Sequence, residues 1–572
     1  MTDVARSSTL PATEAPTTTG SAATSSATAP ASTGSAATSS ATAPASTGSA
    51  SATSATAPAS TGSAATTSAT TTQPTGTTDP AGTGDAGRVR DVVGVGFGPG
   101  NLGLAVALEE ENPGLDALFL ESRDHFAWHP GMLLPGANMQ ISFLKDLATV
   151  RNPRSRYTFT NYLRERGRLV DFINRQTFTP ERVEFTDYLA WVAETVEADV
   201  RYGAQVVAVE EIDAGDGATG GPDAAGDGAR ADGARFLVRA EVDGRTVEIP
   251  TRSVVVARGL RPRMPAWATD PEIAATGRVV HNIDIVPRLD QLDGTVGRAT
   301  GRGWDGTGVR ALVVGGGQSA AEVVRHLHDA GATVTCTFNG FGFVPADDSP
   351  YANRVFDPSA VDDFFTAPDD VRGELMIRHR YTNYACVESE LVTELYEREY
   401  REQITGDRRL DLRRTTVVDG VRALPDGRVE VGLRDRITGE RTADAYDIVV
   451  CATGFVSRGL TGLTGAGAFG GSGVSGGSGE VDDDRSAVRG VTRDYHVVGG
   501  DGPVPGLFVQ GATEATHGLG STLLSNIATR SGELVEALRA DLDLAGSAGD
   551  ARVGAGAEAG AGADRFAGAA TE

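Results

Sequence analysis

Two stretches of the chain share one pattern: a short apolar run, a turn of small residues, and a longer stretch in which apolar and polar positions alternate with helical spacing. Residues 89–110, VRDVVGVGFGPGNLGLAVALEE, pass from a short valine-rich run through a glycine-rich turn into a stretch with the spacing of an amphipathic helix, and residues 309–338 repeat this order. A strand, a glycine turn and a helix begin a unit that builds a parallel sheet covered by helices. The pattern therefore predicts an α/β protein with two Rossmann-like domains.

The first glycine turn has the spacing of a dinucleotide-binding loop. Gly94 and Gly96 occupy the first two positions of the G-x-G-x-x-G pattern, Gly98 follows, and Pro99 occupies the third position. In such loops, backbone N–H groups and the helix N-terminus face a pyrophosphate. The next apolar run, LDALFLES, leads to Glu121, a carboxylate suited to accept hydrogen bonds from ribose hydroxyls. This order favours a nucleotide site over an ordinary tight turn.

The second glycine turn places Gly315, Gly317 and Ala320 at the same three positions. The strand after it ends in TFNG, without the acid that would bind a free 2′-hydroxyl, so NADPH suits this loop better than NADH. The loop also lacks an arginine to pair with the 2′-phosphate. The choice between the two nicotinamide cofactors is therefore left open by the residues themselves.

Two further strands, in residues 247–265 and 447–455, run into small-residue turns where the chain passes between the two domains. With the second fingerprint nested inside the first domain, this is the organisation of a two-dinucleotide flavoprotein. We expect an FAD-binding domain formed by residues 88–265 and 447–540, the latter also completing the substrate site. We expect an NADPH-binding domain with substrate-binding segments at 266–446. The absence of a C-x-x-C pair disfavours disulfide reductases.

Composition limits the part of the chain that can fold. Residues 1–87 are rich in Thr, Ser and Ala, and residues 19–60 within them repeat TGSAATSSATAPAS with a period of 14. Residues 213–234, 464–484 and 541–572 are also rich in small residues. Such segments have too few large apolar side chains to offset the entropy of ordering the backbone. We therefore expect a disordered arm, two flexible insertions and a disordered tail.

Charge and rare residue types disfavour several function classes. The net charge is −25 and no basic stripe is present, so we expect no nucleic-acid partner. The three cysteines lie far apart without metal-ligand spacing, which predicts buried free thiols and no metal site. We expect no membrane span and, without an apolar N-terminal signal, a cytoplasmic protein.

Residues 121–193, with the motifs GGGQSAAE, DDSPYANRVFDP, YTNYACV, ATGF and THGLGSTLLSNIATRSGEL in order, resemble the N-hydroxylating flavin monooxygenases, specifically the L-ornithine N-monooxygenases of siderophore biosynthesis. The resemblance spans about residues 90–535 and implies the following reaction. NADPH reduces FAD, the reduced flavin captures O2 as a C4a-hydroperoxide, and the ornithine side-chain amine attacks its distal oxygen to give N5-hydroxyornithine. Family members are often homotetramers.

Other functions remain as alternatives. Lysine and diamine N-hydroxylases, which act on substrates such as putrescine and cadaverine, are the nearest ones within the class. A flavin NADPH oxidase that makes peroxide without oxygenating an amine is a different class. A repeat-bearing scaffold protein is disfavoured by the two nucleotide loops.

The resemblance also implies roles for individual residues. The substrate would be bound by Lys145, through its α-carboxylate, and by Asn353, Asn383 and Ser525. The residues that would line FAD are Glu121, His129, Gln140, Thr522, Leu523 and Leu524, and those that would touch NADPH are Gln318 and Ser319. Ordinary structural roles are the alternatives: Asn383 could cap a turn, Ser525 could cap or bend a helix, and His129 could satisfy a buried hydrogen bond.

Two features of the chain stand out beside this pattern. Gly520 occupies a position where the family more often has an acidic residue, in the loop expected to seat the flavin. Lys145 is the only lysine of 572 residues, and all 50 other basic side chains are arginine. One explanation is a compositional bias with a single chance survivor. The other is that this position requires a slim ammonium, because a guanidinium is wider, planar and forked.

Overall fold

The computed structural model describes residues 88–112, 114–212, 233–292, 298–300, 303–460, 462–463, 490–499 and 502–542. The predicted arm, nearly all of the first predicted insertion, the second insertion and the tail beyond Leu542 lie outside the described residues.

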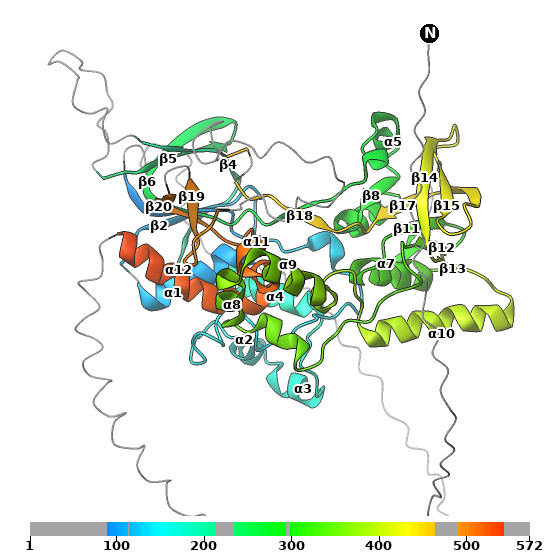
Figure 1. Cartoon of the computed structure of the whole chain (residues 1–572), viewed down its shortest axis with the longest axis horizontal. Coiled ribbons are helices and arrows are strands. Elements are labelled where there is room, and N and C mark those ends of the chain that lie inside the picture. Colours follow the sequence, from blue (N-terminus) through cyan, green and yellow to red (C-terminus); the bar gives the residue numbers. More distant parts are fainter. Residues whose placement is uncertain are drawn as a thin grey trace, which may run out of the picture. The chain divides into compact units, whose positions relative to one another are not determined.

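An eight-stranded sheet holds the first glycine loop (Figure 1). Its strands are β1 (Arg90–Val95), β2 (Ala117–Leu120), β3 (Asp199–Arg201), β4 (Ala204–Glu211), β5 (Phe236–Val242), β6 (Arg245–Val256), β19 (His496–Gly499) and β20 (Gly502–Val509). Five of them run parallel in the order β20-β6-β1-β2-β3. Val92 of β1 packs against α1 (Pro99–Glu111) and α12 (Ile527–Asp541) on one face, whereas Val93 and Val95 pack against the hairpin β4-β5 on the other. Burial on both faces explains the continuous valine run of β1.

A five-stranded parallel sheet holds the second glycine loop. Its strand order is β13 (Leu410–Arg413), β12 (Thr333–Thr337), β11 (Arg310–Val314), β17 (Ile448–Cys451) and β8 (Val279–His281). One face packs against α6 (Ile285–Gln291), α7 (Gln318–Asp329) and α10 (Ser389–Thr405). The other face packs against a meander of β14 (Thr416–Ala423), β15 (Val429–Asp435) and β16 (Arg441–Tyr446).

Two crossings join the sheets, and each begins at a small-residue turn. After β6 the chain forms β7 (Leu260–Pro262), and after β17 it forms β18 (Phe455–Ser457), which pairs with β7 in an antiparallel ribbon. The return crossing starts after Cys451, because β17 completes the second sheet by pairing with β11 and β8. The domain boundary expected at residue 447 therefore falls too early.

The remaining elements lie outside the two sheets and the ribbon. The helices are α2 (Phe159–Glu165), α3 (Leu169–Asn174), α4 (Arg182–Thr195), α5 (Pro271–Ala275), α8 (Ala360–Thr366), α9 (Asp369–Arg378) and α11 (Glu514–His517). The 3-10 turns are η1 (Pro130–Met132), η2 (Ala266–Ala268), η3 (Asn282–Asp284), η4 (Ala352–Phe356), η5 (Arg380–Thr382), η6 (Leu519–Thr522) and η7 (Leu524–Asn526), and β9 (Arg298–Thr300) pairs with β10 (Gly303–Asp305). No helix in the described part of the chain is long and apolar enough to cross a membrane.

Candidate functional site

The first glycine loop lies at the switch point of the eight-stranded sheet. From β1 the chain continues to β2 and β3 on one side, whereas β6 and β20 lie on the other, and ligands bind at such points in α/β sheets. Gly96 has a φ of +86°, and a Cβ added there would lie 2.6 Å from the carbonyl oxygen of Ala257. A Cβ added to Gly94 would lie 2.3 Å from the ring of Phe119. Both glycines thus let the loop lie against neighbouring strands.

The N-terminus of α1 is open to an anion. Gly98 precedes the helix and Pro99 is its first residue, and the first turn contains neither a side-chain cap nor an acidic residue. A Cβ added to Gly98 would meet no atom within 4 Å. Uncapped amides at the positive end of a helix, with free space above a glycine, fit the diphosphate of a dinucleotide.

Glu121 lies beside this loop, at the end of β2, and is 7% exposed. Its carboxylate accepts hydrogen bonds from the backbone amides of Phe97, at 2.8 Å, and Arg123, at 3.0 Å. An ionised carboxylate has about four acceptor positions, so capacity remains for a ribose hydroxyl. Glu121 can therefore fix the loop and still contact a nucleotide.

The second glycine loop repeats this geometry between β11 and β17. Gly315 has a φ of +149°, and a Cβ added there would lie 2.2 Å from the carbonyl oxygen of Ala452. α7 starts after Gly317 with no side-chain cap and no acidic residue in its first turn. The uncapped, acid-free helix N-terminus that fits a dinucleotide at α1 is therefore present at α7 as well.

The two residues expected to touch NADPH both lie in the first turn of α7. Ser319 is half-buried there. Gln318 donates to Glu322 at 3.0 Å and to Glu388 at 3.3 Å, and accepts from the backbone N–H of Glu388 at 2.9 Å. Its amide is thus engaged within the protein. Burial, and then the charge of Glu322, raise the pKa of Glu388.

A buried ion pair joins the helices of the two sheets. Arg182 of α4 forms two parallel hydrogen bonds of 2.8 Å with the carboxylate of Glu322 on α7, which is 1% exposed. A bidentate pair of this kind fixes the relative orientation of the two side chains in addition to pairing their charges. The ion pair fixes α7 against α4, and it thereby fixes the position of the second glycine loop, which precedes α7.

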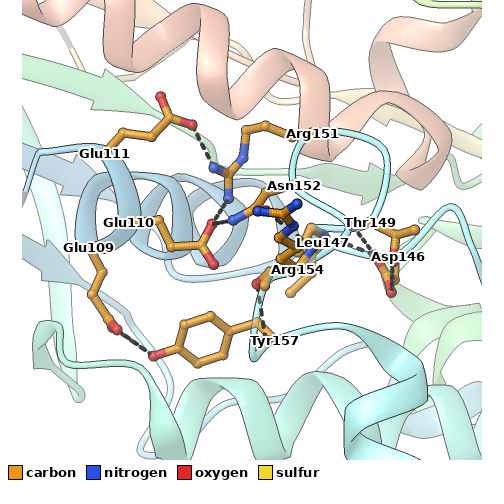
Figure 2. Close-up of polar contacts among 12 residues, drawn as sticks. Glu109, Glu110, Glu111, Asp146, Leu147, Thr149, Arg151, Asn152, Arg154 and Tyr157 are labelled. Carbon is orange, nitrogen blue, oxygen red and sulfur yellow. Dashed lines mark hydrogen bonds and ion pairs between the residues drawn. The ribbon is translucent and has the colours of Figure 1, made fainter. Parts of the chain in front are cut away.

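The segment that carries Lys145 is held by the C-terminal end of α1 (Figure 2). Three consecutive glutamates, 109–111, close that helix. Tyr157 donates to the first of them at 2.7 Å, and Arg151 pairs with the second and third at 2.6 and 2.5 Å. Both anchoring residues follow Lys145 in the chain, so these contacts fix the C-terminal part of the segment against α1.

Asp146, next to Lys145, holds the turn from inside and is 3% exposed. Its carboxylate accepts hydrogen bonds from the backbone N–H groups of Ala148, Thr149 and Phe159 and from the Thr149 hydroxyl, at 2.6 to 2.9 Å. Burial raises the pKa of Asp146, whereas these hydrogen bonds act in the opposite direction. The backbone that carries Lys145 is thus fixed by one buried side chain.

Substitution Asp146→Asn is expected to destabilise the protein by about 1–3 kcal/mol, because an NH2 group would replace one acceptor and face donors. The same change should raise the KM for the substrate that Lys145 is predicted to bind. Denaturant unfolding and steady-state kinetics measure the two effects. Thr149→Val, which removes one of the four hydrogen bonds, is the control with a smaller effect, and wild-type stability in Asp146→Asn would contradict the role of Asp146.

Lys145 is half-buried, with its ammonium 5.8 Å from the centroid of the Phe356 ring. Phe356 ends η4, the turn that also carries Asn353. Burial lowers the pKa of Lys145, and the negative charge of Asp357 acts in the opposite direction. A partly desolvated ammonium gains from an anionic partner, such as the carboxylate of an amino acid.

The other predicted substrate residues lie on segments that share one apolar cluster with Phe356. The cluster comprises Val355, Phe356, Phe364 and Leu519, with Leu375, Met376, Tyr384 and Leu523 packed against it. Asn353 is on η4 and donates from its side chain to the Asp348 carbonyl at 2.8 Å, Asn383 directly precedes Tyr384, and Ser525 follows Leu523 by two residues. The fold therefore brings the four segments of Lys145, Asn353, Asn383 and Ser525 to one region.

The loop that contains η6 and η7 has two buried side-chain hydroxyls without a hydrogen-bond partner among the described residues. They are the hydroxyls of Ser521 and Ser525. Buried polar groups are normally satisfied, so these two fit a site that a ligand completes. A Cβ added to Gly520 would lie 2.6 Å from the side-chain amide of Asn526, so an acidic residue there would require the Asn526 side chain to move. Between the two serines lie Thr522, Leu523 and Leu524, all half-buried.

His129 and Gln140 lie in the stretch between β2 and α2. His129 has a φ of +46°, which is uncommon for a residue other than glycine, and its ring centroid lies 6.1 Å from that of Phe455 in β18. Burial, then the nearby Arg182 and Arg123, lower the pKa of His129 to about 4, so the imidazole is neutral at neutral pH. Gln140 is exposed. His129 thus packs against the return crossing.

Several positioning residues escaped sequence reasoning. Glu322 had a signal, since it closes the motif GGGQSAAE, and Asp146 had a weaker one as a carboxylate inside an apolar run. Arg182, the partner of Glu322, had none, because the two residues are 140 positions apart.

Comparisons with known proteins agree on one family. Residues 88–457 match the family model described as L-lysine 6-monooxygenase/L-ornithine 5-monooxygenase. An L-ornithine N(5)-monooxygenase of Burkholderia cepacia is 38% identical over 436 residues, which cover 75% of this chain and 90% of the relative.

Solved structures give the same result. A complex of the Kutzneria sp. 744 ornithine N-hydroxylase KtzI with reduced FAD, NADP+ and L-ornithine is 38% identical, with a TM-score of 0.67, and the match covers 79% of this chain and 99% of that one. The L-lysine 6-monooxygenase of Pseudomonas syringae is 26% identical, with a TM-score of 0.61, over 79% of this chain and 100% of that one. The chain therefore belongs to the L-lysine 6-monooxygenase/L-ornithine 5-monooxygenase family.

Proposed function

We propose that this protein is an FAD- and NADPH-dependent monooxygenase that hydroxylates the side-chain amine of L-ornithine to N5-hydroxyornithine, a building block of hydroxamate siderophores. The observation that carries the proposal is the half-buried ammonium of Lys145, placed beside η4 where the predicted substrate segments meet. The ornithine hydroxylases of B. cepacia and Kutzneria, each 38% identical to this chain, support the choice of substrate.

Two glycine loops would hold the cofactors. The loop before α1, with Glu121, would hold FAD, and the loop before α7, with Ser319, would hold NADPH. When bound and reduced by NADPH, FAD would supply the electrons that activate O2, one atom of which is transferred to the amine. The unpartnered hydroxyls of Ser521 and Ser525 would be satisfied by flavin or substrate.

The protein's own part in the reaction is to bind and orient ornithine. Lys145 would pair with the α-carboxylate, and Asn353, Asn383 and Ser525 would line the rest of the pocket. The reacting amine must be neutral to act as a nucleophile, whereas a free alkylammonium has a pKa of about 10.4. Desolvation of the amine at the far end from Lys145 would favour that neutral form.

The alternative substrates differ from ornithine in side-chain length or in the presence of a carboxylate, and the proposed site would distinguish both features. Lysine is one methylene longer, and the solved lysine 6-monooxygenase is less similar to this chain, at 26% identity. Putrescine and cadaverine have no carboxylate for Lys145. A cytoplasmic location, consistent with the three buried free cysteines, and a homotetrameric assembly are further parts of the proposal.

A substrate panel tests this assignment. Purified protein loaded with FAD is expected to form hydroxylated product from L-ornithine with a kcat/KM at least about tenfold above that for L-lysine, since one methylene is worth that much in a fitted pocket. Putrescine and cadaverine should give less. Product from a diamine but not from ornithine would contradict the assignment, and NADPH oxidation without any hydroxylamine would favour the oxidase alternative.

A further inference from the structure

The loop after β12 is where a dinucleotide's adenosine ribose would lie, because ligands bind beyond the carboxyl ends of parallel strands. In this chain that loop, TFNGFGFVP, has neither an acid for a 2′-hydroxyl nor an arginine for a 2′-phosphate. If the cofactor is NADPH, its 2′-phosphate needs a cation from another part of the chain.

The structure brings two arginines to this loop from the neighbouring strands. Residues 413–416, from the end of β13 to the start of β14, run alongside it: the N–H of Thr415 donates to the carbonyl of Gly340 at 2.7 Å, and the N–H of Thr416 donates to that of Phe338 at 3.1 Å. Arg414 lies in this turn, with its guanidinium 5.7 Å from the centroid of the exposed Phe341 ring.

Arg436 reaches the same loop from the end of β15. Its Nη1 donates to the carbonyl of Asn339 at 3.3 Å, and its own backbone N–H donates to the carbonyl of Thr415 at 2.8 Å. The adjacent acid, Asp435, turns one carboxylate oxygen to the backbone N–H groups of Ile437 and Thr438. Among the described residues, Asp435 forms no ion pair with the Arg436 guanidinium, and its other carboxylate oxygen accepts from the Thr415 hydroxyl at 3.5 Å.

Neither arginine belongs to an ion pair among the described residues, although the chain has an excess of acidic side chains. Arg413, one position earlier, shows the contrast, since it pairs with Asp411 at 2.7 Å and with Asp444 at 3.5 Å. Arg414 and Arg436 instead present exposed donors at the end of β12. Guanidinium groups bind phosphate oxygens in bidentate geometry, and aromatic rings such as Phe341 stack with bases.

We propose that Arg414 and Arg436 form the binding site for the 2′-phosphate of NADPH and set the preference for NADPH over NADH. The site replaces, by residues distant in sequence, the arginine that the loop itself lacks. This inference rests on the proposed use of a nicotinamide cofactor at the second glycine loop, and it adds the residues that choose between the two cofactors.

The test compares Arg414→Met, Arg436→Met and the double variant with the wild type, all as full-length, FAD-loaded protein. Calorimetry with NADP+ and with NAD+ measures binding without turnover, and stopped-flow flavin reduction gives the NADPH to NADH ratio. Each single change should weaken NADP+ binding by about fivefold or more and the double change by still more, while NAD+ binding stays unchanged, because a charged hydrogen bond to phosphate is lost. Arg422→Met, which removes an arginine paired with Glu430 on the same meander, is the matched control.

Three outcomes would overturn the inference: unchanged NADP+ affinity in the double variant, an equal loss for NADP+ and NAD+, or a wild type that binds both equally well. Failure of the proposed function looks different. In that case the wild-type flavin would be reduced by neither cofactor, or ornithine would give no hydroxylated product.

Discussion

Replacing Lys145 with arginine is expected to raise the KM for L-ornithine by about tenfold or more, while flavin reduction by NADPH stays within about twofold of the wild type. The ammonium occupies a half-buried position over the Phe356 ring, next to a turn held by Asp146. The planar guanidinium of arginine is wider than the lysine ammonium, and its N–H donors point in different directions. Steady-state kinetics with ornithine, together with anaerobic stopped-flow reduction, separate the two effects.

Two further variants sharpen that result. Lys145→Met removes the charge and should weaken ornithine binding at least as much, whereas Arg154→Lys, at an exposed position of the same segment, should change nothing. Near-normal ornithine affinity in Lys145→Arg would leave compositional bias as the explanation for the single lysine.

Alanine at Gly96 is expected to impair folding, whereas alanine at Gly98 is expected to weaken FAD binding without impairing folding. Gly96→Ala should destabilise the protein by about 2 kcal/mol or more, because φ is +86° and the new Cβ would lie 2.6 Å from a backbone carbonyl. Gly98→Ala should fold like the wild type, since its φ is −78° and no atom lies within 4 Å of the new Cβ. It should still bind FAD about tenfold more weakly, because that Cβ enters the space where the diphosphate approaches the loop.

Thermal unfolding and FAD titration of the apo-protein measure both effects. Wild-type FAD affinity in Gly98→Ala would mean that the loop does not cradle the cofactor. Wild-type stability in Gly96→Ala would contradict the close approach to Ala257.

The sequence predicted those parts of the fold that depend on residues close to one another in the chain. The two strand–glycine–helix units are local, and Gly96 and Gly315 are required by the backbone conformation of single turns. The sheet to which β17 belongs depends instead on pairing with β8 and β11, and its valine run carries no information about those partners. The boundary placed at residue 447 failed for that reason.

The candidate site shows the same division. Lys145 could be singled out by its rarity, and Asn353, Asn383 and Ser525 by motifs. Residues that act across long separations could not be found in this way. Arg182 of α4 binds Glu322 of α7, a helix that packs on the other sheet, and Arg436, which follows β15, reaches the loop after β12 from almost a hundred residues further along the chain. Their roles depend on contacts made in the tertiary fold, and these contacts cannot be predicted from a local sequence pattern.

The most direct test of the central claim is product analysis under 18O2. FAD-loaded protein given NADPH, L-ornithine and 18O2 is expected to yield hydroxyornithine that carries one 18O atom on the side-chain nitrogen, with about one product molecule per NADPH consumed, because a monooxygenase transfers one oxygen atom and the cofactor supplies the electrons. Consumption of NADPH with formation of hydrogen peroxide, and no labelled hydroxyornithine, would contradict the account.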